Sequence, residues 1–129
     1  PFHYHEEVRF WHVGKPFLAY SQRTWAASDG RPLHGETGYW RLPEGLGNVE
    51  VVMAHPNGII EIEEGSLEGQ RIEVATTTVA GTTTAKEVTA LMRVFEVVGD
   101  TLLYRVAMAA VGEPLTHHLD ATLTRTRSA

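Results

Sequence analysis

Hydrophobic and polar residues alternate along most of this chain, with the period of two that is typical of half-buried β-strands. In residues 6–13, EEVRFWHV, Val8 and Phe10 share one face while Arg9 and Trp11 share the other. Turns rich in glycine, proline, asparagine or aspartate separate the alternating segments. The pattern predicts strands over residues 6–13, 17–26, 34–41, 49–55, 59–65, 71–79, 101–111 and 117–127.

Residues 84–100, TAKEVTALMRVFEVVGD, fit two patterns. Val88, Leu91 and Phe95 have a helical spacing, whereas the alternation towards the end of the segment fits a strand. We favour a strand, because the Gly99–Asp100 pair is typical of a tight turn between two strands.

Eight or nine strands joined by short turns describe an antiparallel meander. A sheet of this length exposes its edges unless it curls and closes. We therefore predict an all-β fold, an antiparallel up-and-down β-barrel, in a single domain that spans residues 1–129. Small barrels of this kind enclose a cavity wide enough for one ligand.

Composition narrows the possible functions. The chain has no cysteine, which excludes disulfides, zinc–thiolate sites, iron–sulfur clusters and thiol nucleophiles, and makes a cytoplasmic location the default expectation. The net charge of −5 and the scattered basic residues argue against a nucleic-acid partner. No apolar run is long enough to cross a membrane as a helix, so no membrane association is expected.

Sequence patterns of common enzymes are missing: there is no phosphate-binding glycine loop, no His-x-x-x-His helix and no Gly-x-Ser-x-Gly turn. The pairs Glu6–Glu7 and Glu63–Glu64 point to opposite faces of their strands, and we interpret both as solvated surface. His3 and His5 share a strand face and could clip a metal ion, but a frayed chain end explains them more simply.

Several of the seven histidines lie where the mouth of a barrel is expected. His34, His55 and the His117–His118 pair all sit at predicted strand ends next to turns. Taken alone, each of these histidines also fits an ordinary surface position. The apolar residues near them can line a cavity, however, and a neutral imidazole in an apolar cavity is a typical axial ligand of haem iron.

Five long stretches resemble the nitrobindin family: HVGKPFLAYSQRTW, DGRPLHGETGYWR, VEVVMAHPNGIIEIEEG, TAKEVTAL and MAAVGEPLTHHL. The resemblance runs from Pro1 to Arg127. It implies a cytosolic, calycin-like barrel, akin to fatty-acid-binding proteins, that holds a solvent-exposed ferric haem b. It also implies nitric-oxide binding and conversion of peroxynitrite to nitrate, so these two small molecules are the expected partners.

The resemblance further implies site residues. The family's iron ligand is the histidine of a Pro-x-x-x-His-Leu pattern, which here runs from Pro114 to His118 and Leu119. His118 is thus the expected axial ligand and catalytic residue, and His117 a variable neighbour. Strict alternation would instead place His117 on the face of Leu119, so the strand pattern alone leaves the choice between them open.

Other positions match family residues around the haem. Lys86 matches a residue that meets a propionate, although a plain surface lysine is an equal alternative. His34 and Leu33 match the open, distal side, Met108 matches an apolar contact inside the barrel, and His55 matches a polar position at the rim.

The family also opens with a Gly-x-Trp-x-Gly-x-Gly strand, which this chain lacks ahead of Pro1. We therefore expect the natural protein to begin upstream, and a barrel without that strand to have an open seam and a weakened haem site.

Two other functions fit the same pattern. A non-enzymatic carrier of a fatty acid or another apolar small molecule would need a buried arginine or tyrosine for the carboxylate, and Tyr104, Arg105 and Arg93 are candidates. A haem-based nitric-oxide sensor would need the same ligand as the enzyme. The oligomeric state is left open, with a homodimer as one candidate.

Overall fold

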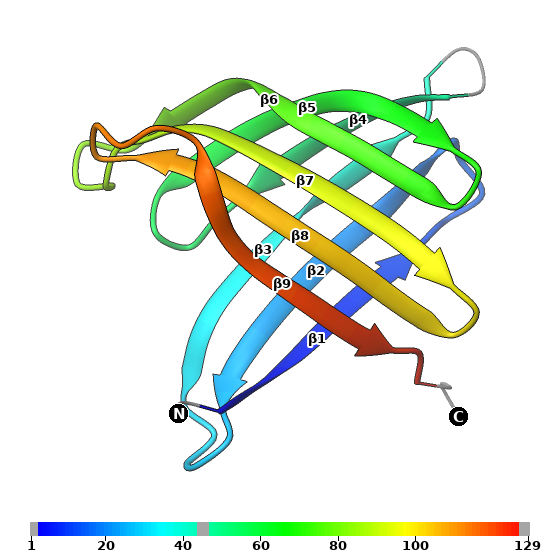
Figure 1. Cartoon of the computed structure of the whole chain (residues 1–129), viewed down its shortest axis with the longest axis horizontal. Coiled ribbons are helices and arrows are strands. Elements are labelled where there is room, and N and C mark those ends of the chain that lie inside the picture. The colour runs from blue at the N-terminus through cyan, green and yellow to red at the C-terminus, as the bar shows by residue number, and fades with distance from the viewer. Residues whose placement is uncertain (1–2, 44–46, 127–129) are drawn as a thin grey trace.

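The computed structural model describes residues 3–43 and 47–126; the outermost parts of the predicted domain, 1–2 and 127–129, lie outside it. The described part forms one antiparallel sheet whose nine strands follow their order in the sequence, as Figure 1 shows. The prediction of an all-β meander is confirmed, and residues 88–98 form a strand rather than a helix. The strands are β1 (Tyr4–Trp11), β2 (Phe17–Ala26), β3 (Pro32–Arg41), β4 (Asn48–Ala54), β5 (Ile59–Glu68), β6 (Arg71–Gly81), β7 (Val88–Val98), β8 (Thr101–Ala110) and β9 (Thr116–Thr124).

The sheet curls into a nearly closed barrel with β1 and β9 at its two edges. Among the described residues no backbone pairing joins these two strands. The interior is bridged by side chains instead, because the hydroxyl of Tyr104 on β8 donates a hydrogen bond to the carboxylate of Glu6 on β1. In the described part of the chain, no helix is long and apolar enough to span a membrane.

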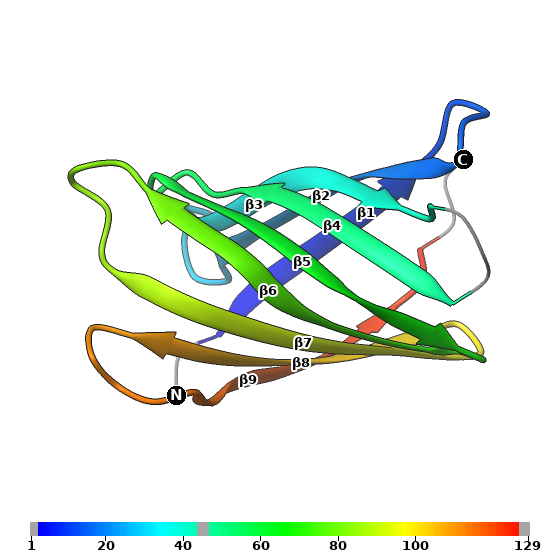
Figure 2. The ribbon, with the colours of Figure 1, turned by 90° about the horizontal axis from the view of Figure 1, so that it is seen from above.

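A second opening in the hydrogen-bond pattern lies between β6 and β7. Only Arg71–Ala75 of β6 pairs with Met92–Glu96 of β7, and the remaining halves of the two strands diverge, as Figure 2 shows. At the point of divergence the backbone N–H of Leu91 donates to the Thr76 hydroxyl, at 3.1 Å.

The hydrophobic core fills one end of the barrel. Its centre is aromatic: the rings of Trp40 and Phe95 meet edge to face with centroids 4.9 Å apart, and Tyr20 lies 5.8 Å from Trp40. Such edge-to-face pairs add to the stabilisation that burial of their apolar surface provides. The remaining buried members of the cluster are Val49, Val51, Met53 and Val74.

Candidate functional site

The histidines at strand ends meet at the end of the barrel opposite the core. An antiparallel meander brings the ends of even-numbered strands and the starts of odd-numbered ones to the same rim. A cavity of about 460 Å³ lies there, and its lining includes Leu33, His34, His55, Met108 and His118. The structure thus brings together five of the six predicted site residues.

Lys86, the sixth, does not line the cavity. It is exposed in the connection between β6 and β7, two residues before the cavity-lining Val88. It therefore lies beside the rim rather than inside it.

A β-bulge determines the direction of His118. Val106 of β8 pairs with Leu119 of β9, but the next residue of β8, Ala107, pairs with His117, so His118 is an extra residue without a partner in the ladder. Consecutive residues of a regular strand point to opposite faces, whereas His118 and Leu119 both line the cavity. Bulges are common at barrel rims, where they re-aim a side chain in this way.

The two adjacent histidines have different surroundings. The Nε2 atom of His117 lies 3.5 Å from Oδ2 of Asp120, and both side chains are more than half exposed. The side chain of His118 makes no hydrogen bond or ion pair with any residue in the described ranges. Its nitrogen lone pair is therefore free to act within the cavity lining.

A second bulge arranges Leu33 and His34. Arg23 of β2 pairs with Gly35 of β3 and Trp25 pairs with Pro32, so two residues of β3 face the single residue Thr24. The N–H of His34 donates to the Thr24 hydroxyl at 3.0 Å, which holds the irregular backbone in place. Both Leu33 and His34 consequently line the cavity.

A buried ion-pair cluster lies where the cavity meets the core. Arg93 of β7 reaches across the interior, with Nη1 3.1 Å from Oε2 of Glu36 on β3 and Nη2 3.2 Å from Oε1 of Glu61 on β5. Its Nε lies 3.2 Å from Oε1 of Glu63, but neither oxygen of Glu63 has a hydrogen bond in the described structure. Four ionisable side chains thus share the interior.

The cluster corrects our interpretation of the glutamate pairs as solvated surface. Glu61 and Glu63 are 1% and 0% exposed, whereas the alternating Ile60 and Ile62 are 56% and 39% exposed. The face of β5 that carries glutamates is therefore the inner one, because Arg93 supplies the opposite charge that buried carboxylates need. Glu6 was also misassigned: it lines the cavity and accepts a hydrogen bond from Gln22 at 3.1 Å.

Burial and neighbouring charges raise the pKa of one of these carboxyl groups and lower that of others. Burial raises the pKa of Glu63 to about 8, since the nearby charge of Arg93 compensates only in part and the Glu61 carboxylate opposes ionisation. Burial also opposes the charge of Arg93, but the carboxylates around it outweigh burial and raise the pKa of the guanidinium. At neutral pH we therefore expect Glu63 to be protonated beside a charged Arg93.

Glu36 behaves in the opposite way. Burial alone would raise its pKa, but the hydrogen bond with His34, the charge of Arg93 and the hydrogen bond from Tyr20 lower the pKa to about 2. The Tyr20 hydroxyl donates to Oε2 of Glu36 at 2.8 Å, and burial together with this carboxylate raises the pKa of Tyr20. Glu36 is therefore an ionised acceptor at the floor of the cavity.

Our sequence analysis missed this acidic cluster, although one signal could have found it. Arg93 lies two residues from both Leu91 and Phe95, so it shares a strand face with two apolar residues that become buried. A buried arginine needs acidic partners, and β5 offers them on alternate positions.

Comparison with known proteins adds independent findings. The family model described as "THAP4-like, heme-binding beta-barrel domain" matches residues 1–125. A protein named Peroxynitrite isomerase 2 from Mycobacterium marinum is 57% identical over 129 residues, covering 97% of this chain and 80% of the relative. A protein of the same name from Mycobacterium avium is 59% identical over 131 residues, covering 98% of this chain and 81% of the relative.

A solved structure shares the fold. The crystal structure of Rv2717c from M. tuberculosis matches with a TM-score of 0.89 at 51% sequence identity. The match covers 98% of this chain and 83% of that chain.

Proposed function

Because the chain belongs to the THAP4-like haem-binding β-barrel family, we propose that it binds ferric haem b through His118 and converts peroxynitrite to nitrate in the described cavity. The names of its relatives from M. marinum and M. avium support the reaction. The observation that carries the proposal is the unpartnered imidazole of His118 in the cavity lining, next to His117, which faces Asp120 instead.

The cavity fits a haem group in size and chemistry. Its volume of about 460 Å³ lies within the range of roughly 300–1,000 Å³ that is usual for sites of cofactors and drug-sized ligands. Leu33, Val88, Met108 and Leu119 provide apolar walls, and the free imidazole provides the donor that haem iron takes in many proteins. Lys86 beside the rim is suited to pair with a propionate at the solvent side.

The protein supplies a ligand, a sheltered volume and access, while the bond chemistry belongs to the cofactor. When bound through His118, ferric haem would supply a Lewis-acidic iron. The isomerisation itself is balanced: the O–O bond of peroxynitrite breaks, a third N–O bond forms, and no external electron or proton is consumed. His34, whose side chain is 44% exposed, can donate a hydrogen bond to the reacting anion at the mouth of the cavity.

The experiment that tests the proposal combines haem loading with kinetics. The haem-loaded chain should speed the decay of peroxynitrite and increase the nitrate-to-nitrite ratio of the products. His118→Ala should lose both the ferric Soret band and the acceleration, whereas His117→Ala should retain most of each. An unaccelerated decay with a normal Soret band would contradict the enzymatic part and favour a haem-based nitric-oxide sensor.

The alternative of a fatty-acid carrier finds less support in the interior. Arg93 is already paired with carboxylates, the Tyr104 hydroxyl donates to Glu6, and Arg105 is exposed beside Asp120. None of the three predicted anchors is thus free for a ligand carboxylate. Displacement of a fluorescent fatty acid tests this directly, and saturable binding that His118→Ala leaves unchanged would favour the carrier.

Two further parts of the proposal concern the cell and the assembly. We expect the protein in the cytoplasm, which cell fractionation tests. A homodimer stays a prediction, which light scattering coupled to size-exclusion chromatography tests.

A further inference from the structure

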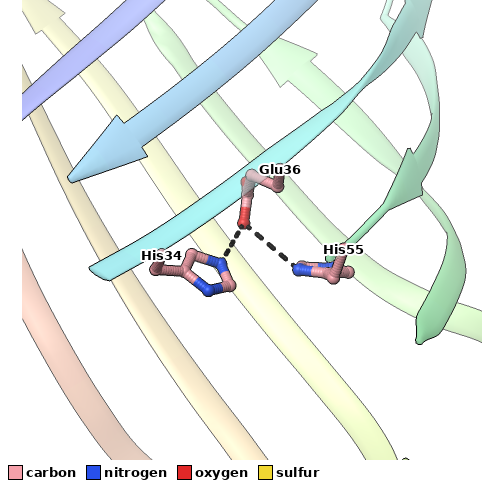
Figure 3. Close-up of side chains that lie close together, drawn as sticks. All are labelled: His34, Glu36 and His55. Atoms are coloured by element: carbon pink, nitrogen blue, oxygen red, sulfur yellow. Dashed lines mark hydrogen bonds and ion pairs between the residues drawn. The ribbon is translucent and has the colours of Figure 1, made fainter. Parts of the chain in front are cut away.

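Three polar side chains of the cavity lining lie close together. His34 and Glu36 come from the start of β3, and His55 follows the end of β4. One donor atom from each lies within 4.8 Å of the other two. Figure 3 shows the carboxylate of Glu36 pointing between the two imidazole rings.

The hydrogen bond between Glu36 and His34 is long, and the distances within this group also suit a shared cation. Oε1 of Glu36 lies 3.4 Å from Nε2 of His34 and 3.7 Å from Nδ1 of His55. Hydrogen bonds between such atoms usually measure roughly 2.7–3.2 Å. Ligand atoms bound about 2.1 Å from a tetrahedral metal ion lie roughly 3.4 Å from each other.

Glu61 holds the ring of His55 from the side away from Glu36. Nε2 of His55 lies 2.6 Å from Oε2 of the buried Glu61. Nδ1, the other ring nitrogen, faces Oε1 of Glu36 in a side-chain pair that is 7% and 6% exposed. A cation between these two atoms would give both of them a partner in the interior.

The outer contacts match those of metal sites in general. A metal-bound histidine commonly donates its second N–H to a carboxylate, as His55 does to Glu61. Oε2 of Glu36 is held by the Tyr20 hydroxyl and by Arg93, which leaves Oε1 for a shared cation. Each of these two ligand side chains is thus oriented by a neighbour.

We propose that His34, Glu36 and His55 bind a divalent transition-metal ion such as Zn²⁺, Fe²⁺ or Co²⁺ on the cavity wall. The set of two imidazoles and one carboxylate suits these borderline metals. Three protein ligands leave at least one coordination position open to the cavity, where a small anion can bind. The site shares no ligand with the proposed haem iron, so it does not depend on the proposed function.

The test is a titration of the full chain with Zn²⁺ after treatment with EDTA, with and without haem. Calorimetry should show one Zn²⁺ bound per chain, and Co²⁺ should give visible absorption bands of a low-symmetry site. His34→Ala should weaken Zn²⁺ binding at least tenfold, and Glu61→Gln, which removes the carboxylate that holds both His55 and Arg93, by about 10–100-fold.

Matched controls separate this site from other histidines. His118→Ala, His117→Ala and His5→Ala should each retain the wild-type affinity for Zn²⁺. His34 is partly exposed, so His34→Ala is expected to fold, and its circular dichroism spectrum checks this. Absence of Zn²⁺ binding, an unchanged affinity in His34→Ala, or a loss that follows His5→Ala would each overturn the proposal.

Discussion

His118 and Leu119 are consecutive residues of β9, yet both side chains line the cavity. The bulge that makes this possible inserts His118 between Leu119, which pairs with Val106, and His117, which pairs with Ala107. A single backbone irregularity therefore places His118 in the cavity lining and leaves His117 out of it.

Deleting one of the two adjacent histidines tests the role of the bulge. Deleting either one gives the same shortened chain. The shortened strand has no extra residue, so regular alternation would turn the remaining histidine away from the face of Leu119. We expect a folded chain without a Soret band after haem addition, although one histidine of the pair is still present. The matched control is His117→Ala, which keeps the strand length, and retention of haem by the deletion variant would contradict the role of the bulge.

Lys86 offers a graded test of the rim. If it pairs with a propionate at the solvent side, Lys86→Ala should release haem about two- to fivefold faster, since an exposed ion pair contributes at most about 1 kcal/mol. Transfer of haem to an excess of a scavenging haem protein measures the rate. Lys15→Ala is the control, because Lys15 lies between β1 and β2 at the other end of the barrel, and equal rates in the two variants would make Lys86 an ordinary surface residue.

Arg93 should contribute to stability more than any exposed arginine. Arg93→Met removes the positive partner of Glu36 and Glu61 and leaves two buried carboxylates uncompensated. We expect a loss of about 3–5 kcal/mol in the free energy of unfolding, measured with urea. Arg105→Met, which breaks the exposed pair with Asp120, should cost less than about 1 kcal/mol. Similar losses of unfolding free energy in Arg93→Met and Arg105→Met would contradict a stabilising role of the buried cluster.

The protonated state of Glu63 predicts an unusual dependence of stability on pH. The pKa of Glu63 is about 8 in the folded chain, against an ordinary value of 4.5. Between these two pH values the folded state therefore keeps a proton that the unfolded state has released. The stabilisation is complete below pH 4.5 and is lost as the pH rises towards 8, by up to a few kcal/mol in total.

Glu63→Gln has no such proton to lose. Its melting temperature should fall less than that of the wild type between pH 5 and pH 8, roughly the interval between the two pKa values. Glu36 titrates in the opposite sense, because its lowered pKa of about 2 makes its stabilisation disappear only in acid. If the melting temperatures of Glu63→Gln and the wild type change with pH in parallel, Glu63 is ionised in the folded chain.

Local sequence patterns predicted the strands, because alternation and turn residues act over a few positions. They did not reveal which face of β5 lies inside. Alternation defines two faces, and the choice between Ile60 and Glu61 depends on Arg93, 32 residues away along the chain. The sequence therefore predicted the barrel but not its charged interior.

The direction of the His118 side chain could not be predicted from the sequence for a similar reason. A bulge is a property of two paired strands, and β9 alone reads as regular from His117 to Leu123. The only sign was the conflict between strand alternation, which favoured His117, and the family pattern, which favoured His118. In the structure His118 lines the cavity together with Leu119, because the extra residue changes which side chains share a face. Which of the two histidines binds haem iron stays a prediction.

The divergence of β6 and β7 beyond Thr76 and Leu91 affects how the interior can be reached. In the described chain no ladder of backbone hydrogen bonds joins the outer halves of these strands, so moving them further apart breaks no such ladder. A guest that entered between these strands would need only a local opening there, which is far faster than global unfolding.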